Sequence, residues 1–131
     1  MNLTVDTNIF LAVALDEPEK DRIIDLGLGF NAISPEILPY EIGNALSAMV
    51  KRRQLSKHEA TAAFDITQDI PVRLVGCDIG KALDIAMRFG LYAYDAYFLQ
   101  CAQSMDSPLL TLDKRMQSVA KEMQITVLDP S

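Results

Sequence analysis

The sequence has 131 residues, of which 50% are hydrophobic and 23% charged, so it fits one domain with a substantial core, and intrinsic disorder is excluded. The longest apolar run is the seven residues from Ile9 to Leu15, against roughly 20 needed to cross a bilayer. The net charge of −6 opposes the basic profile usual in nucleic-acid-binding proteins. Because the first residues also lack the basic start of a secretory signal, we expect a cytoplasmic protein.

The cysteines and the histidine limit the kinds of site that the chain can build. Cys77 and Cys101 are the only cysteines and His58 is the only histidine. No CxxC pair occurs, so zinc fingers and thiolate zinc sites are excluded, as is any mechanism that needs two histidines. Acidic side chains are instead concentrated at residues 1–42, which hold eight of them against two basic ones. Some of these carboxylates are candidates to bind cations.

Short β-type segments alternate with helical segments along the chain. In chain order we predict a strand at 3–5, helices at 8–15 and 18–26, a strand at 32–34, helices at 39–53 and from 56 onward, a strand at 72–75, helices at 78–89 and 94–103, a strand at 109–112, a helix at 114–123 and a strand at 125–128. Strands separated by helices pair in parallel through right-handed crossovers. We therefore expect residues 1–131 to form a single α/β sandwich with a central five-stranded, mostly parallel sheet and helices on both faces.

Two of the predicted helices carry pronounced apolar patterns. The helix at 39–53 has an apolar stripe at helical spacing that fits either the core or a dimer contact; its members are Ile42, Ala45, Leu46 and Met49. The helix at 94–103 is apolar on nearly every side, which predicts burial. We expect the nearby tyrosines to pack in the core rather than to stack on bases; they are Tyr92, Tyr94 and Tyr97.

Four carboxylates stand where a parallel sheet places its ligands, beyond the carboxyl ends of the strands. Asp6 and Asp113 follow predicted strands, and Glu41 and Asp95 lie in the first turns of predicted helices. Simpler roles remain open, because Asp6 and Asp113 also fit N-caps and Glu41 fits a helix dipole. Asp95 has apolar and aromatic neighbours and no basic residue within five positions. Its partner is therefore distant in sequence or a cation from solution, and oxygen ligands without Cys or His favour Mg²⁺ or Mn²⁺.

Four short motifs together are similar to the PIN domain family. They are Val5-Asp6-Thr7-Asn8, Glu41-Ile42-Gly43-Asn44-Ala45, Tyr94-Asp95-Ala96-Tyr97 and Thr111-Leu112-Asp113. Their order and spacing span essentially the whole chain and most closely resemble the VapC-type toxin ribonucleases of VapBC toxin–antitoxin pairs. The resemblance implies one or two Mg²⁺ or Mn²⁺ ions held by four catalytic residues, Asp6, Glu41, Asp95 and Asp113. It also implies that four polar residues lie in or beside the site, namely Thr7, Asn8, Asn44 and Thr111.

The activity that this resemblance implies is metal-dependent endonucleolytic hydrolysis of single-stranded RNA. A metal-activated water would attack the phosphodiester bond and leave a 5′-phosphate and a 3′-hydroxyl. The family also implies a small VapB-like antitoxin as partner, and a homodimer. Two alternatives remain open: a non-catalytic PIN-like module that binds nucleic acid or protein, and a DNA nuclease like the flap endonucleases, which are larger.

Two basic groups are candidates for contact with RNA phosphates. Lys51, Arg52 and Arg53 end a predicted helix, where the simpler interpretation is that they complement the helix dipole. Lys114 and Arg115 directly follow Asp113 and begin a helix, where positive charge is mildly unfavourable. A bound phosphate would account for the position of Lys114 and Arg115 at the start of this helix.

Overall fold

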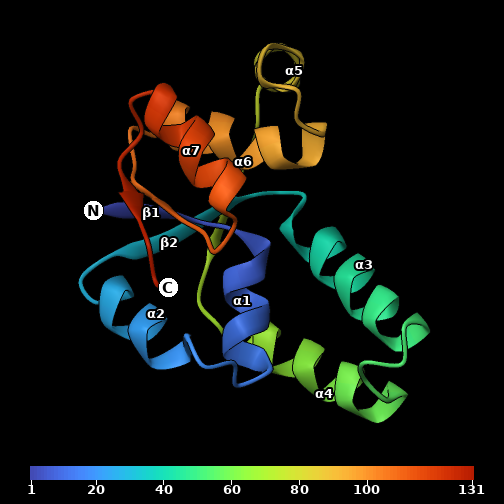
Figure 1. Cartoon of the computed structure of the whole chain (residues 1–131). Coiled ribbons are helices and arrows are strands. Elements are labelled where there is room, and N and C mark those ends of the chain that lie inside the picture. Colours follow the sequence, from blue (N-terminus) through green and yellow to red (C-terminus); the bar gives the residue numbers. More distant parts are fainter.

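The computed structural model describes all residues from 1 to 131 as twelve helices and strands (Figure 1). In chain order they are β1 (Asn2–Val5), α1 (Thr7–Ala14), α2 (Lys20–Gly27), β2 (Asn31–Pro35), α3 (Leu38–Lys51), α4 (Lys57–Gln68), β3 (Arg73–Val75), α5 (Ile79–Phe89), α6 (Ala93–Ser104), β4 (Leu109–Leu110), α7 (Lys114–Glu122) and β5 (Val127–Leu128). The strands form one sheet in the order β3-β2-β1-β4-β5, and every neighbouring pair is parallel. The predicted α/β sandwich is therefore confirmed.

The helices cover the two faces of this sheet. Figure 1 shows α5, α6 and α7 on one side and α1, α2, α3 and α4 on the other, with β1 running between the two layers. The strand order runs from β1 to β3 in one direction and through β4 to β5 in the other. The order in which successive strands are added thus reverses between β1 and β4, and such a switch point is where parallel sheets bind ligands. Asp6 follows β1 directly.

The last two strands are shorter than predicted, since β5 begins at Val127 and β4 ends at Leu110, where the chain leaves the sheet. The ladder between β4 and β5 joins Leu109 to Val127 and Leu110 to Leu128. Beyond it, the backbone N–H of Leu112 donates to Oδ1 of Asn8 at 3.2 Å. A side chain of α1 thus replaces the next strand-to-strand contact. The helix predicted from residue 18 also begins later, at Lys20.

Local signals placed several helix ends correctly. Ser56 and Glu59 form the predicted capping box at the start of α4. Gly90 ends α5 with a φ of 68°, a conformation that glycine adopts without the steric cost of a Cβ atom.

The core accounts for half of the apolar stripe on α3. Ile42 and Leu46 belong to a continuous cluster of 24 buried hydrophobic residues, whereas Ala45 and Met49 are half-buried and lie outside that cluster. The prediction that the aromatic residues of α6 are buried is wrong at its N-terminus, where Tyr92 is 83% exposed and Tyr94 58% exposed. They lie at the N-cap and in the first turn of α6, whereas the residues of α6 that are buried lie from Ala96 onward. None of the helices has the length and apolar character needed to cross a lipid bilayer.

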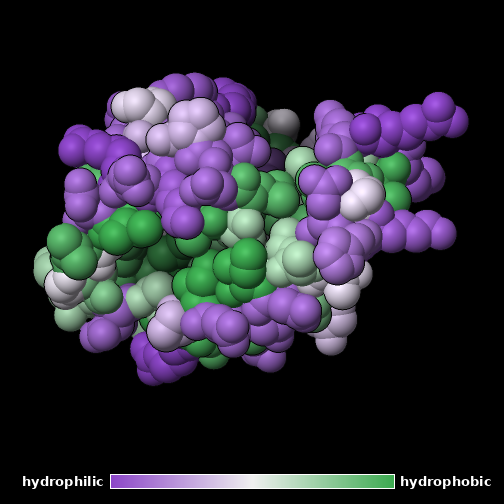
Figure 2. Space-filling model, turned by 90° about the horizontal axis from the view of Figure 1, so that it is seen from below, coloured by the Kyte–Doolittle hydropathy of each residue, from purple (hydrophilic) through white to green (hydrophobic).

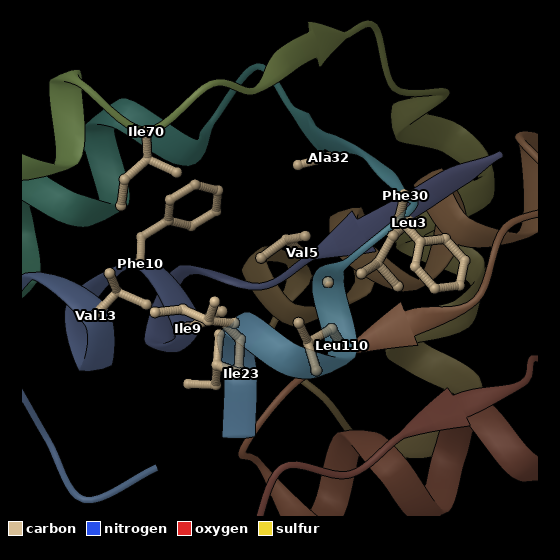
Figure 3. A pocket seen from close by; sticks show the side chains of 12 residues that line it. Leu3, Val5, Ile9, Phe10, Val13, Ile23, Phe30, Ala32, Ile70 and Leu110 are labelled. Carbon is tan, nitrogen blue, oxygen red and sulfur yellow. The ribbon is translucent and has the colours of Figure 1, made fainter. Parts of the chain in front are cut away.

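An apolar cavity of about 190 Å³ lies between the sheet and the helices α1 and α2. Side chains from both layers point toward it (Figure 3), including Leu3 and Val5 of β1, Ile9 and Phe10 of α1, and Ile23 of α2. Eleven of its 12 lining residues are hydrophobic. The cavity offers no charged or hydrogen-bonding side chain and is therefore separate from any site built on carboxylates.

Candidate active site

The four carboxylates predicted to meet at the sheet edge line one cleft of about 570 Å³. Asp6 comes from the end of β1, Glu41 from α3, Asp95 from α6 and Asp113 from the start of α7. No lysine, arginine or histidine is among the lining residues. The structure therefore brings together four acidic side chains from four distant segments without a basic partner.

Asp6 is held by hydrogen bonds to both of its carboxylate oxygens. It is only 5% exposed and caps α1, because its Oδ1 accepts from the backbone N–H of Thr7 at 2.7 Å. Its Oδ2 accepts from the Thr111 hydroxyl at 2.7 Å and from the Asn8 amide at 3.1 Å. The predicted cap is thus real, and the same carboxylate also lines the cleft.

Asp113 likewise both caps a helix, α7, and lines the cleft. Its Oδ1 accepts from the backbone N–H groups of Arg115 at 2.9 Å and Met116 at 3.1 Å, which makes it the N-cap of α7. Its own backbone N–H donates to the Thr111 hydroxyl at 3.0 Å. Since that hydroxyl donates in turn to Asp6, Thr111 couples the two acidic positions.

Glu41 and Asp95 are less constrained. Oε2 of Glu41 accepts from the Thr7 hydroxyl at 2.8 Å. Asp95 is half-buried, and no hydrogen bond or ion pair reaches its carboxylate. Asn44 is exposed and lines the cleft. The side chains of Asp95 and Asn44 are therefore free to bind a ligand.

Burial and mutual repulsion raise the pKa values of three of these acids. The pKa of Asp6 rises to about 7, chiefly because the carboxylate is buried, and the charges of Asp95 and Glu41 add to the rise. Burial also raises the pKa of Glu41, with a further contribution from Asp95. The pKa of Asp95 rises through burial and through the charge of Asp113. A cation placed among these groups would relieve both effects.

The donor set fits a hard divalent cation. The cleft offers carboxylate, hydroxyl and amide oxygens, which are the ligands that Mg²⁺ and Mn²⁺ prefer. No three acidic, histidine or cysteine side chains are already arranged around one point to hold a metal ion. An ion would therefore draw carboxylates together from their present positions, and the unbonded Asp95 is the one that moves with least loss of hydrogen bonding.

Sequence reasoning missed two residues of this region, Tyr40 and Gln117, and misplaced a third, Tyr94. Tyr40 and Tyr94 line the cleft and are exposed, whereas Tyr94 was expected in the core. Gln117 is only 4% exposed and donates to the backbone oxygen of Thr111 at 2.8 Å. A polar residue on the apolar face of the helix 114–123 was the signal that could have identified Gln117.

The basic residues that follow Asp113 have partners within the chain. Nζ of Lys114 lies 2.9 Å from Oδ2 of Asp129 in an exposed ion pair. Nη2 of Arg115 donates to the backbone oxygen of Phe89 at 2.6 Å, at the end of α5. These contacts account for both side chains without a bound phosphate.

Comparisons with known proteins agree with this architecture. A family model described as PIN domain matches residues 3–122. Among solved structures, PAE2754 from Pyrobaculum aerophilum is similar with a TM-score of 0.71 and 21% identity, over 97% of this chain and 83% of that one. VapBC2 from Rickettsia felis, bound to a DNA fragment from its promoter, has a TM-score of 0.69 and 14% identity over 98% of both chains. A toxin–antitoxin complex from Klebsiella pneumoniae has a TM-score of 0.64 and 18% identity, over 100% of this chain and 98% of that one.

A search of curated proteins found no match. At these identities the structural similarities show the fold, and the family model shows the relationship, since it spans nearly the whole chain. Its range includes Asp6, Glu41, Asp95 and Asp113. The chain belongs to the PIN domain family.

Proposed function

We propose that this single-domain protein is a cytoplasmic, metal-dependent endoribonuclease that hydrolyses single-stranded RNA and is the toxin of a toxin–antitoxin pair. PIN domains are generally nucleases, and toxin–antitoxin complexes are among the structural neighbours. The observation that carries the proposal is the cleft that four carboxylates line without a basic side chain among them. Such a cleft repels a phosphate unless cations are bound in it, so a hydrolytic role requires a metal.

Each acidic residue has a proposed role that follows from its position. Asp6, Asp95 and Asp113 would hold one Mg²⁺ or Mn²⁺ ion, and Glu41 would bind a second ion or orient the attacking water. When bound, such ions neutralise the phosphate and supply a more acidic water near neutral pH.

The polar neighbours would position these acids. The Thr111 hydroxyl and the Asn8 amide fix Oδ2 of Asp6. Thr7 holds one oxygen of Glu41 and leaves the other for a water. Asn44, at the rim, would contact the RNA, and the exposed ring of Tyr94 would stack on a base.

A cleavage assay with a matched variant tests this proposal. We expect the wild type to cut single-stranded RNA with Mg²⁺ or Mn²⁺ and to stop when the metal is chelated. Asp95→Asn should lower the rate at least a hundredfold, whereas Asp84→Asn, which removes an exposed acid from α5, should not. End-group analysis should find 3′-hydroxyl ends. Products with 2′,3′-cyclic phosphate, or equal rates for Asp95→Asn and wild type, would contradict the mechanism.

A protein partner of basic character would fit the same cleft. We propose a VapB-like antitoxin that inserts an arginine or lysine among the carboxylates, because its charge-assisted hydrogen bonds to them would replace the bound cation. The antitoxin should then compete with Mn²⁺ for the wild type. Simultaneous binding of antitoxin and Mn²⁺ with undiminished affinity would place the antitoxin elsewhere.

The homodimer implied by the family has a candidate surface on α5. Ile79 is 65%, Leu83 49% and Met87 69% exposed, and their spacing of four places them on one helix face. In an antiparallel pair of α5 helices centred on Leu83, Ile79 faces the partner's Met87 and Arg88 faces the partner's Asp78. Light scattering should report a dimer for wild type and a monomer for Leu83→Lys. A wild-type monomer at micromolar concentration would contradict this proposal.

A further inference from the structure

A cluster of positive charge lies at the turn between α3 and α4, outside the acidic cleft. Lys51, Arg52, Arg53 and Lys57 are exposed and make up four of the 12 basic side chains in the chain. No acidic residue occurs between Glu41 and Glu59. In Figure 2 long hydrophilic side chains project from the right-hand end of the molecule, where Figure 1 places this turn. We call these four residues the basic turn.

The basic turn has no partner within the protein. The chain contains two ion pairs, Lys20 with Asp16 and Lys114 with Asp129, and no side chain of the basic turn donates a hydrogen bond. Lys57 also stands at the first position of α4, where a cation is disfavoured by the helix dipole. Four unpaired cations in a chain of net charge −6 are thus concentrated at one place, and although dipole compensation at the end of α3 explains Lys51 and the C-cap Arg52, it does not explain Lys57.

Helix α3 connects the basic turn to the acidic cleft. It begins beside the cleft with Tyr40, Glu41 and Asn44 and ends at Lys51, about 15 Å further along the helix axis at 1.5 Å per residue. Asn44, Ser47 and Lys51 are exposed and share one helix face, because they are three and four positions apart. This face is free of negative charge from Asn44 onward.

We propose that the basic turn binds the phosphate backbone of single-stranded RNA that runs along α3 out of the cleft. The inference rests on the proposed function, since it names where the remainder of the substrate is held. The four carboxylates oppose entry of a polyanion, and cations beside the path offset that repulsion by displacing counterions from the RNA. A strand long enough to reach from the cleft to the turn gains these contacts, and a dinucleotide does not.

The test compares two triple variants of equal charge change. The turn variant is Arg52→Gln, Arg53→Gly and Lys57→Gln, and the control is Arg22→Gln, Lys81→Gln and Lys121→Gln, all of which are exposed residues. Fluorescence anisotropy with Mn²⁺ measures binding of uncleavable RNA of about twelve nucleotides, within the range bound by other single-strand binders. We expect the turn variant to bind at least tenfold more weakly. The slope of log K against log salt should fall by up to about 2, at roughly 0.7 per lost contact.

A single substitution separates this role from a structural one. Arg53 has a φ of 61° and follows the C-cap of α3, a position that favours glycine. Arg53→Gly should therefore leave the melting temperature unchanged or raise it, and still weaken binding of the long RNA. Equal losses in the turn and control variants, no loss in either, or the same loss with double-stranded DNA would overturn the proposal.

Cleavage of a dinucleotide measures the proposed function separately. If the basic turn binds RNA as inferred, wild type, turn variant and control should cut it at equal rates. If no RNA is cut but long RNA binds through the turn, the nuclease proposal fails and this inference stands. If the dinucleotide is cut but the turn variant binds long RNA like wild type, this inference fails and the nuclease proposal stands.

Discussion

Asp6 serves the fold and the cleft with one carboxylate. One oxygen caps α1, and the other is fixed by Thr111 and Asn8. The sequence predicted both roles, because an aspartate after a strand and before a helix fits either. It did not predict that Thr111 links Asp6 to Asp113, since the contact between Thr111 and Asp6 joins residues 105 positions apart and depends on where β4 ends.

The raised pKa of Asp6 predicts how stability depends on pH. Without metal, the folded state keeps this proton up to about pH 7, whereas the ordinary pKa is 3.8. The stability that the group confers is therefore complete below about pH 4 and lost as the pH rises through 7. Asp6→Asn keeps a capping side chain and does not titrate. In chelator, the stability of Asp6→Asn relative to wild type should rise by a few kcal/mol between pH 4 and pH 8.

Urea unfolding at several pH values measures this difference. Excess Mn²⁺ should restore the free energy of unfolding of the wild type at pH 8, since binding to the folded state adds stability by mass action. It should leave the free energy of unfolding of Asp6→Asn unchanged. A difference that stays constant from pH 4 to pH 8 would show that burial does not shift this carboxyl.

Thr111 is predicted to position the site rather than to contact the substrate. Thr111→Val removes the hydroxyl that holds Asp6 and accepts from the Asp113 backbone. Loss of such a supporting contact lowers metal affinity by about 10- to 100-fold. Thr111→Ser keeps the hydroxyl and should keep the metal affinity of the wild type. Calorimetry with Mn²⁺ checks both variants, and equal affinities for Thr111→Val and wild type would exclude the positioning role.

At the scale of elements, α1 separates the two hollows of the molecule. Thr7, Asn8 and Leu11 face the acidic cleft, whereas Ile9, Phe10 and Val13 face the apolar cavity (Figure 3). Helical periodicity predicted this element and most others, because their buried residues recur at helical spacing. Sequence patterns did not predict the lengths of β4 and β5 or the exposure of Tyr92 and Tyr94. Side chains distant in sequence decide where a strand ends and which end of α6 is covered.

Packing around the apolar cavity is predicted to carry much of the stability of α1. Phe10 is 2% exposed, so Phe10→Ala should lower the free energy of unfolding by about 3 to 5 kcal/mol. Tyr92 is 83% exposed, and Tyr92→Ala should change it by no more than about 0.5 kcal/mol. Urea unfolding of the two variants provides the comparison, and similar losses would contradict the burial described for α1 and α6.

At the scale of the whole molecule, charge is segregated. Acidic side chains line the cleft at the switch point of the sheet, and the basic turn lies at the far end of α3. The net charge of −6 argued against a nucleic-acid-binding protein, but it averages over these two regions. Composition cannot reveal the segregation, because it arises only when the fold brings Asp6, Glu41, Asp95 and Asp113 together.

The four carboxylates of the cleft are proposed to form a divalent-metal site. Isothermal titration calorimetry with Mn²⁺, on wild type and Asp95→Asn with and without uncleavable RNA, tests it without assuming which RNA is cut. We predict that wild type binds one or two ions, since four acids can share them, and that Asp95→Asn loses most of this affinity. If wild type binds no Mn²⁺ at millimolar concentration even with RNA present, the carboxylates serve as caps and helix-dipole partners, and the metal-dependent mechanism is wrong.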